Sequence, residues 1–276
     1  MGDVTPPREI VDYYDRHAEE SRLQHGPMQL ELERTQDILT RVLPAPPARV
    51  IDVGGAAGAY SAWLAARDYD VRLLDASPRL VDEARRRNAT LARPIAALDV
   101  GDARALPYES ASADVVLVMG PLYHLTSRDG RLQALREALR VLRPGGVAAV
   151  AGISRFASAL DGLARGLAVD PAFVRMRDRD LVDGQHRNDT PRSDYFTTAY
   201  FHRPAELGDE LTAAGFADAR VLGVEGPAWM VADFDARWAD PVLHADMMAV
   251  ARAVEAEPAM LGVSAHLLAI GHKAPR

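Results

Sequence analysis

The fold is decided by the stretch Arg49-Val50-Ile51-Asp52-Val53-Gly54-Gly55-Ala56-Ala57-Gly58-Ala59-Tyr60-Ser61. Aliphatic residues interrupted by one acid are typical of a buried strand, and the small residues that follow form a tight turn. A helix is expected from Tyr60 to Ala66. Glycine in such a turn accepts a positive φ and leaves bare backbone for a ligand, while a helix N-terminus attracts an anionic group. The stretch therefore predicts a strand, a turn and a helix that bind a nucleotide-like cofactor.

The spacing of the glycines separates the cofactor classes. The dinucleotide fingerprint G-x-G-x-x-G needs a second glycine where this chain has Ala56 or Ala57. A P-loop is excluded, because Lys273 is the only lysine in the chain. A nicotinamide-dependent oxidoreductase shares the strand, turn and helix and stays an alternative, as does a noncatalytic protein that binds a cofactor.

Composition bounds the class of protein. The chain has 276 residues, of which 48% are hydrophobic and 26% charged, as expected for one large domain or a core domain with a cap. A net charge of −7 argues against a nucleic-acid partner. The absence of cysteine excludes disulfides, thiol nucleophiles and cysteine-ligated zinc. No apolar run of about 18 residues occurs, so we expect a cytoplasmic protein without a membrane partner.

Further acids follow later strands of the predicted sheet. Residues 71–75 are expected to form the second strand, and Ser77 then caps a helix that begins at Pro78. Asp75 lies 23 residues beyond Asp52, the distance at which an acid after the second strand binds ribose hydroxyls. Residues 95–100 and 114–119 are expected to form the third and fourth strands. The third leads to Asp102, and the fourth ends at Met119.

Taken in order, these features resemble the class I S-adenosylmethionine-dependent methyltransferases that act on small molecules. Asp52, Gly54 and Gly58 resemble their D-x-G-x-G-x-G motif, with Ala56 in place of the middle glycine. A helix over 128–142, the sequence Leu-Arg-Pro-Gly-Gly over 142–146 and a strand over 147–153 complete the array. The resemblance covers residues 48–154. It implies an α/β fold with a Rossmann-like seven-stranded sheet, whose last strand (265–272) runs antiparallel between the fifth strand and the sixth (220–224).

The resemblance also implies S-adenosyl-L-methionine as the cofactor. Asp75 would bind the ribose, and Asp102 with the backbone of Ala103 would bind the adenine. The expected cofactor-binding set is Tyr14, Arg22, Asp52, Gly54, Gly55, Gly58, Asp75, Ala76, Asp102, Ala103 and Met119.

Regions outside this core are predicted to cover the strand ends. Residues 1–47 form an N-terminal helical lid, in which Tyr14 and Arg22 line the cofactor; the alternative is two amphipathic helices packed on the core. Residues 155–200 are predicted to be a helical cap insertion. Residues 201–276 return to the core and contain a second cap segment over 226–261.

The predicted reaction is the transfer of a methyl group to a small-molecule acceptor, as in secondary metabolism. Alignment of the reacting atoms in a dry site is the main requirement, and oxygen or nitrogen acceptors also need a base. His124, just after the fourth strand, is predicted as that base; the alternative is a structural histidine that bonds loop backbone. Tyr13 and Glu225 are predicted to orient an acceptor that is partly aromatic or apolar and is methylated at oxygen, nitrogen or carbon. No metal motif is present, and a homo-oligomer is left open.

Overall fold

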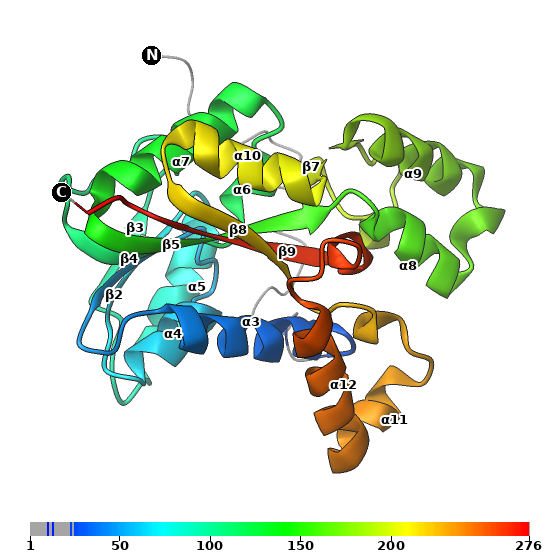
Figure 1. Ribbon diagram of the computed structural model, residues 1–276, viewed down its shortest axis with the longest axis horizontal. Helices are drawn as coiled ribbons and strands as arrows, with labels where there is room; N and C mark the ends of the chain where they lie inside the picture. The colour runs from blue at the N-terminus through cyan, green and yellow to red at the C-terminus, as the bar shows by residue number, and fades with distance from the viewer. Residues whose placement is uncertain (1–9, 11–12, 14–22, 24, 276) are drawn as a thin grey trace.

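The computed structural model describes Ile10, Tyr13, Leu23 and residues 25–275 (Figure 1). Its strands are β1 Arg49–Val53, β2 Asp70–Asp75, β3 Ala97–Val100, β4 Ala113–Val118, β5 Leu142–Ser154, β6 Gln185–His186, β7 Ala199–His202, β8 Ala217–Gly223 and β9 His266–His272. Its α-helices are α3 Met28–Val42, α4 Ala59–Ala65, α5 Pro78–Asn88, α6 Pro121–His124, α7 Arg128–Val141, α8 Ala157–Arg165, α9 Pro171–Asp183, α10 Pro204–Ala214, α11 Phe234–Ala239 and α12 Pro241–Val254. Four short 3₁₀ helices are η1 Leu167–Val169, η2 Ser193–Tyr195, η3 Ala228–Met230 and η4 Leu261–Val263.

The core sheet has the predicted strand directions. Its order is β3-β2-β1-β4-β5, all parallel, and β9 then runs antiparallel between β5 and β8. The carboxyl ends of β1, β2 and β4 meet at one edge, since Val53 lies opposite Leu74 on one side and Val118 on the other. The Rossmann-like fold with an antiparallel last strand is therefore confirmed.

Two helical layers bury the two faces of this sheet (Figure 1). Side chains alternate between the faces of a strand. Thus Val115 and Leu117 of β4 belong to one core cluster with α3 and α4, while Val116 and Val118 belong to the other with α7 and α10. This double burial explains why residues 115–118 of β4 are all apolar. The helical layers cover the two faces of the sheet, so a ligand would bind at the carboxyl ends of its strands.

The cap insertion differs from the prediction. It contains helices α8 and α9, as expected, but also β6 and β7, so the sheet has nine strands and not seven. β7 continues the sheet beside the end of β5 through the pair Ile153 and Phe201, and β6 pairs with β7. These strands are too short to show an alternating pattern; β7 is stabilised by pairing with β5, and β6 by pairing with β7.

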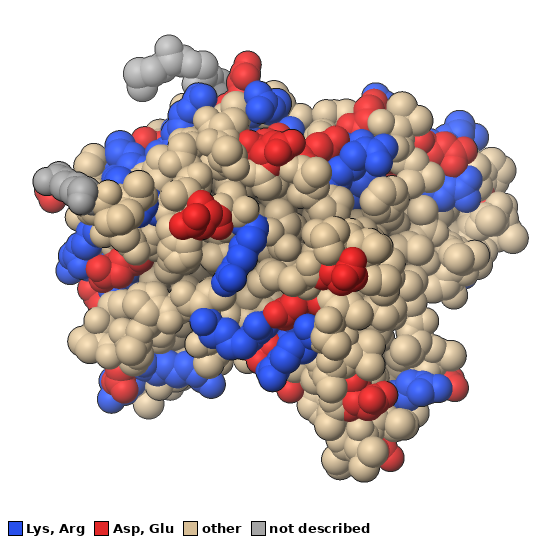
Figure 2. Space-filling model, in the orientation of Figure 1, with Lys and Arg blue, Asp and Glu red and all other residues tan. Residues whose placement is uncertain are grey.

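Beyond the sheet, the second cap segment packs against helix α3. Its residues Trp229, Phe234 and Met247 share a core cluster with Leu30 of α3. On the face shown in Figure 2, acidic and basic side chains are interspersed among the described residues. None of the helices in the described part of the chain has the length and apolar character needed to cross a bilayer.

The turn after β1 is built on left-handed backbone. Gly54 and Gly58 have φ of 75° and 83°, and Ala56, which replaces the middle glycine of the resembled motif, has φ of 46°. A Cβ at Gly54 would lie 2.3 Å from Cδ of Pro121, so this position tolerates only glycine. Ala56 adopts the same region with a side chain, which costs about 1–2 kcal/mol.

We therefore predict that Ala56→Gly raises the free energy of unfolding by about 0.5–1 kcal/mol, because relief of the left-handed strain exceeds the entropic cost of glycine. Ala57→Gly is the matched control. Ala57 has an ordinary negative φ, so glycine there should destabilise the protein by about 0.5–1 kcal/mol. Urea unfolding of both variants measures the effect, and equal destabilisation by both would show that Ala56 is not strained.

Candidate functional site

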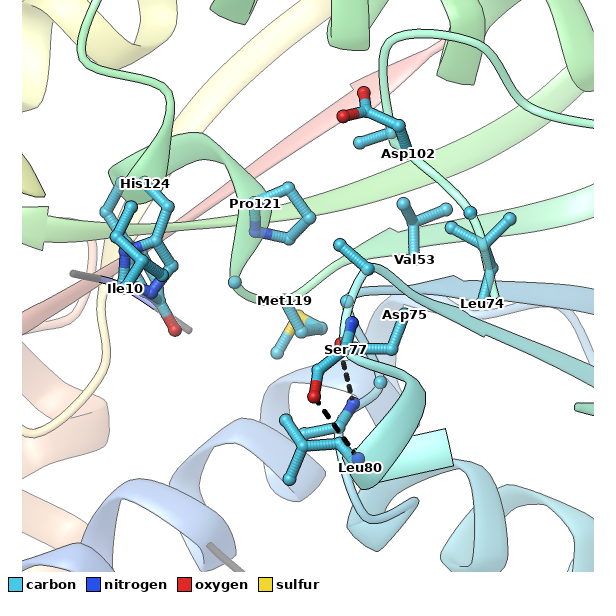
Figure 3. Close-up of a pocket in the computed structure, with 18 of the residues that line it drawn as sticks. Ile10, Val53, Leu74, Asp75, Ser77, Leu80, Asp102, Met119, Pro121 and His124 are labelled. Atoms are coloured by element: carbon cyan, nitrogen blue, oxygen red, sulfur yellow. Dashed lines mark hydrogen bonds between the residues drawn. The ribbon is translucent and has the colours of Figure 1, made fainter. Parts of the chain in front are cut away.

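A cavity of about 340 Å³ lies at the carboxyl edge of β1, β2 and β4 (Figure 3). Eight of the residues predicted from the sequence line it: Gly54, Gly55, Asp75, Ala76, Asp102, Ala103, Met119 and His124. Asp102 and His124 lie on opposite sides of the labelled residues, with Met119 and Pro121 between them (Figure 3). The structure thus brings the predicted loops of four strands, β1 to β4, around one cavity.

Asp75 connects the two loops that form the floor of this cavity. Its Oδ2 accepts a hydrogen bond of 2.9 Å from the backbone N–H of Ala56, and its Oδ1 accepts one of 2.8 Å from Ser77. Ser77 caps α5 as predicted, with its hydroxyl accepting from the N–H of Leu80. Because a carboxylate oxygen has more than one acceptor position, Asp75 can hold both loops and still accept from a ligand.

Asp52 and Gly58, two other predicted residues, lie behind the loop and do not line the cavity. The Asp52 side chain is fully buried, and its Oδ2 accepts a hydrogen bond of 2.7 Å from the Ser61 hydroxyl. Burial raises the pKa of Asp52 to about 6; the Ser61 hydrogen bond opposes that change and the Asp75 charge adds to it. Asp52 therefore fixes the start of α4 from inside the protein.

At the other side of the cavity, Asp102 forms an ion pair with Arg104. The carboxylate accepts from the Arg104 backbone N–H, from Nε and from Nη2, at 2.7, 3.0 and 2.9 Å. Both residues line the cavity. The sequence did not reveal the role of Arg104, although its position two residues after a predicted site acid was the available signal.

His124 lies at the end of α6, and its ring faces both the cavity and the cap. Nδ1 is 3.3 Å from the carbonyl oxygen of Thr198, so the ring donates a proton there. Burial lowers the pKa of His124 to about 4, against the opposing effect of this hydrogen bond. The ring is therefore uncharged at neutral pH. This geometry includes the backbone contact that was the alternative to a catalytic base.

The N-terminal segment reaches the cavity at two described residues. Ile10 and Leu23 are buried and line it. The ring of Tyr13 lies edge-on to Phe196, with centroids 5.4 Å apart, and does not line the cavity. Tyr14 and Arg22, the predicted cofactor residues of the lid, lie outside the described residues.

Glu225 belongs to a separate cluster at the start of β9. Its Oε2 accepts from the Ser264 hydroxyl at 2.6 Å and from the His266 backbone N–H at 3.0 Å, and its Oε1 lies 2.5 Å from Nδ1 of His266. One ligand atom each from Glu31, Glu225 and His266 lies within 4.8 Å of the others, a geometry that could hold a cation. Glu225 does not line the cavity. Three distant segments form this cluster, so no local motif predicted it.

Comparison with known proteins identifies the domain around this cavity. Residues 50–146 match the family model of a methyltransferase domain. The fold is also that of a solved S-adenosylmethionine-dependent methyltransferase from Methanosarcina mazei, with a TM-score of 0.58 and 16% identity over 87% of this chain and 98% of that chain. The chain contains a methyltransferase domain, and its fold is that of S-adenosylmethionine-dependent methyltransferases. The methyl donor of the solved protein agrees with the cofactor predicted from the sequence.

Two curated relatives of the methyltransferase domain are the methyltransferase GfsG of Streptomyces halstedii and a demethylmenaquinone methyltransferase of Beutenbergia cavernae. Each is 32% identical to this chain. The matches cover 53% of this chain and 58% of GfsG, and 54% of this chain and 59% of the second relative. Since this chain spans less than two thirds of either relative, the similarity identifies the methyltransferase domain and leaves the acceptor open.

We predict that His124 makes stability depend on pH. In the unfolded chain its pKa is near 6.5, so the stability that its neutral form contributes is complete above pH 6.5 and is lost as pH falls toward 4. The raised pKa of Asp52 has the opposite effect: because the folded state takes up a proton there before the unfolded chain does, stability rises as pH falls through this range. The difference in the free energy of unfolding between wild type and His124→Gln isolates the contribution of His124. We expect this difference to change by about 2–3 kcal/mol between pH 6.5 and 4.

Urea unfolding at a series of pH values measures this difference. His25→Gln is the control, because His25 is exposed and should leave the curve unchanged. A difference between wild type and His124→Gln that does not vary with pH would contradict the account of a buried neutral ring.

Proposed function

We propose that this protein transfers a methyl group from S-adenosylmethionine to a small-molecule acceptor. The observation that carries the proposal is the convergence of Asp75, Asp102 and the backbone of the Gly54–Gly55 turn on one cavity at the carboxyl ends of three parallel strands. Bound cofactor supplies an activated methyl group on a positively charged sulfur. The role of the chain is then to align the acceptor with that methyl group and to exclude water.

The residues present fit this cofactor. Asp75 lines the cavity and offers a carboxylate for ribose hydroxyls, and the Asp102 loop offers a carboxylate for the adenine amino group. The Gly54–Gly55 turn presents bare backbone, where a Cβ would clash with Pro121 or Leu73. A nicotinamide dinucleotide is less well matched, because the glycine spacing that accommodates a pyrophosphate is missing.

The strand order gives the cofactor a direction. Asp102 follows β3, Asp75 ends β2, and β1 with its turn lies next. Adenine, ribose and the amino-acid part of the cofactor would therefore follow one another along the edge. The reactive end would then lie beside the end of β4, where Pro121, Tyr123 and His124 line the cavity. We place the acceptor beyond these residues, under the cap and the N-terminal segment.

His124 is better suited to orient the acceptor than to remove its proton. A base with a pKa of about 4 has little driving force for proton transfer near neutral pH. We propose that alignment supplies most of the rate, that His124 forms part of the wall of the acceptor site, and that Tyr13 supports this wall from outside the cavity through its contact with Phe196. Glu225 would act indirectly, by holding His266 at the start of β9.

The acceptor is proposed to be a partly aromatic or apolar metabolite. The side chains at the reactive end are mostly aromatic or aliphatic, which suits a compact ligand with few polar groups. One curated relative is named for methylation of demethylmenaquinone, which supports an acceptor of this kind. Incubation of a metabolite extract with methyl-labelled S-adenosylmethionine and the protein tests the proposal. We expect a labelled small molecule, whereas cofactor binding without labelled product would indicate a noncatalytic binding protein.

For cofactor binding we predict that Asp75→Asn weakens affinity for S-adenosylhomocysteine by about tenfold to a hundredfold, because a charged acceptor of ligand hydrogen bonds is lost. Calorimetric titration measures this change. Asp82→Asn on the exposed face of α5 is the control and should bind as wild type does. Since Asp75 also holds two backbone amides, the free energy of unfolding is measured in parallel. A stable Asp75→Asn protein with unchanged affinity would refute the ribose role.

A further inference from the structure

Phe196 lies in a backbone conformation that L-residues rarely adopt. Its φ is 68° and its ψ is −173°, a combination that belongs to glycine. Such a conformation persists only where the surroundings fix it, and it occurs mostly at functional sites. Phe196 comes from the cap insertion, outside the segment that matches the methyltransferase family.

Hydrogen bonds on both sides of Phe196 fix this conformation. Its N–H donates to the Ser193 carbonyl at 3.2 Å, and its own carbonyl accepts from the Asn188 amide at 2.7 Å. The carbonyl of the preceding residue, Tyr195, pairs with Nε2 of the buried His186 at 2.8 Å. The backbone of Phe196 is therefore held from both ends.

His186 is itself held by a buried network inside the cap. Its Nδ1 lies 2.8 Å from Oδ2 of Asp180, and the Ser158 hydroxyl donates to the same oxygen at 2.7 Å. The two ring nitrogens of His186 thus face two oxygen atoms, Nδ1 that of the Asp180 side chain and Nε2 that of the Tyr195 carbonyl, so the ring is fixed from both sides. This network lies outside the cavity. Its visible effect is to fix the peptide that precedes Phe196.

The ring of Phe196 connects the cap to the cavity. Its centroid lies 6.4 Å from that of Tyr123 and 5.9 Å from that of His124, and both of those residues line the cavity. On its other sides lie Tyr13 at 5.4 Å and His186 at 6.3 Å. Thr198, two residues later, provides the carbonyl that holds His124. The loop around Phe196 thus supports the end of the cavity through rings and backbone.

We propose that Phe196 is a positioning residue that fixes Tyr123 and His124 as an aromatic wall against the sulfonium of S-adenosylmethionine. The inference rests on the proposed function, which places the reactive end beside these two residues. An aromatic face attracts a cation. The wall therefore favours the charged methyl donor over its uncharged product, S-adenosylhomocysteine, and assists exchange of product for fresh donor.

The test is calorimetric titration of each ligand into wild type, Phe196→Ala, Phe196→Gly and Phe196→Tyr. For the alanine and glycine variants we expect the ratio of donor affinity to product affinity to fall by about three- to tenfold, with product affinity within about twofold of wild type. Phe196→Tyr keeps the ring and should retain the wild-type ratio. Tyr123→Leu removes the wall itself and should lower the ratio at least as much.

The outcomes separate the inference from the proposed function. The positioning role would be overturned if the ratio of donor affinity to product affinity were unchanged in the alanine and glycine variants, or if affinity for both ligands fell equally. Neither result would affect the proposal of methyl transfer. Failure of the wild-type protein to bind either ligand would refute the proposed function, and the inference with it.

Unfolding measurements test the strained backbone separately. Phe196→Gly should unfold at a higher urea concentration than Phe196→Ala, because glycine adopts the conformation without strain. Phe156 is the matched control, since it is also partly buried but has an ordinary φ of −98°. Phe156→Gly should be less stable than Phe156→Ala. If Phe196→Gly were likewise less stable than Phe196→Ala, the backbone of Phe196 would not be strained.

Discussion

The carboxylate of Asp75 is the interaction on which the arrangement of the site depends. It joins the turn after β1, through Ala56, to the start of α5, through Ser77. The turn needs such a partner because three of its residues have a left-handed backbone. The carbonyl of Leu74 adds hydrogen bonds to Gly54 and Gly55, so the end of β2 organises the loop of its neighbour. A cofactor that bridges these strands therefore meets a surface whose backbone groups are already positioned.

The core and the cap have different tasks in this structure. The parallel sheet supplies the cofactor side of the cavity from local strand-end loops that belong to the methyltransferase domain. Phe196 and Thr198 of the cap do not line the cavity, and they support its far side from outside through their contacts with His124, after β4. The stability of the cap itself rests on a buried network of Ser158, Asp180 and His186. Such a division would allow the cap to change with the acceptor while the cofactor side is kept.

Much of the core could be predicted from the sequence, because its signals are local. The apolar run before Asp52, the acids Asp75 and Asp102 and the Pro144–Gly146 stop each lie within one strand and its following loop. The cap could not be predicted in the same way. β7 is a short strand that depends on β5, and β6 in turn depends on β7. The left-handed backbone of Phe196 depends on partners such as Asn188 and His186. The cluster of Glu31, Glu225 and His266 likewise joins segments that only the folded chain brings together.

The central claim is that the cavity binds S-adenosylmethionine rather than a dinucleotide. The most direct measurement is calorimetric titration of the wild-type protein with S-adenosylhomocysteine and, in parallel, with NAD. The account predicts saturable binding of S-adenosylhomocysteine with a dissociation constant on the order of micromolar, about −8 kcal/mol, and no binding of NAD at the same concentrations. Saturable binding of NAD without binding of S-adenosylhomocysteine would contradict it.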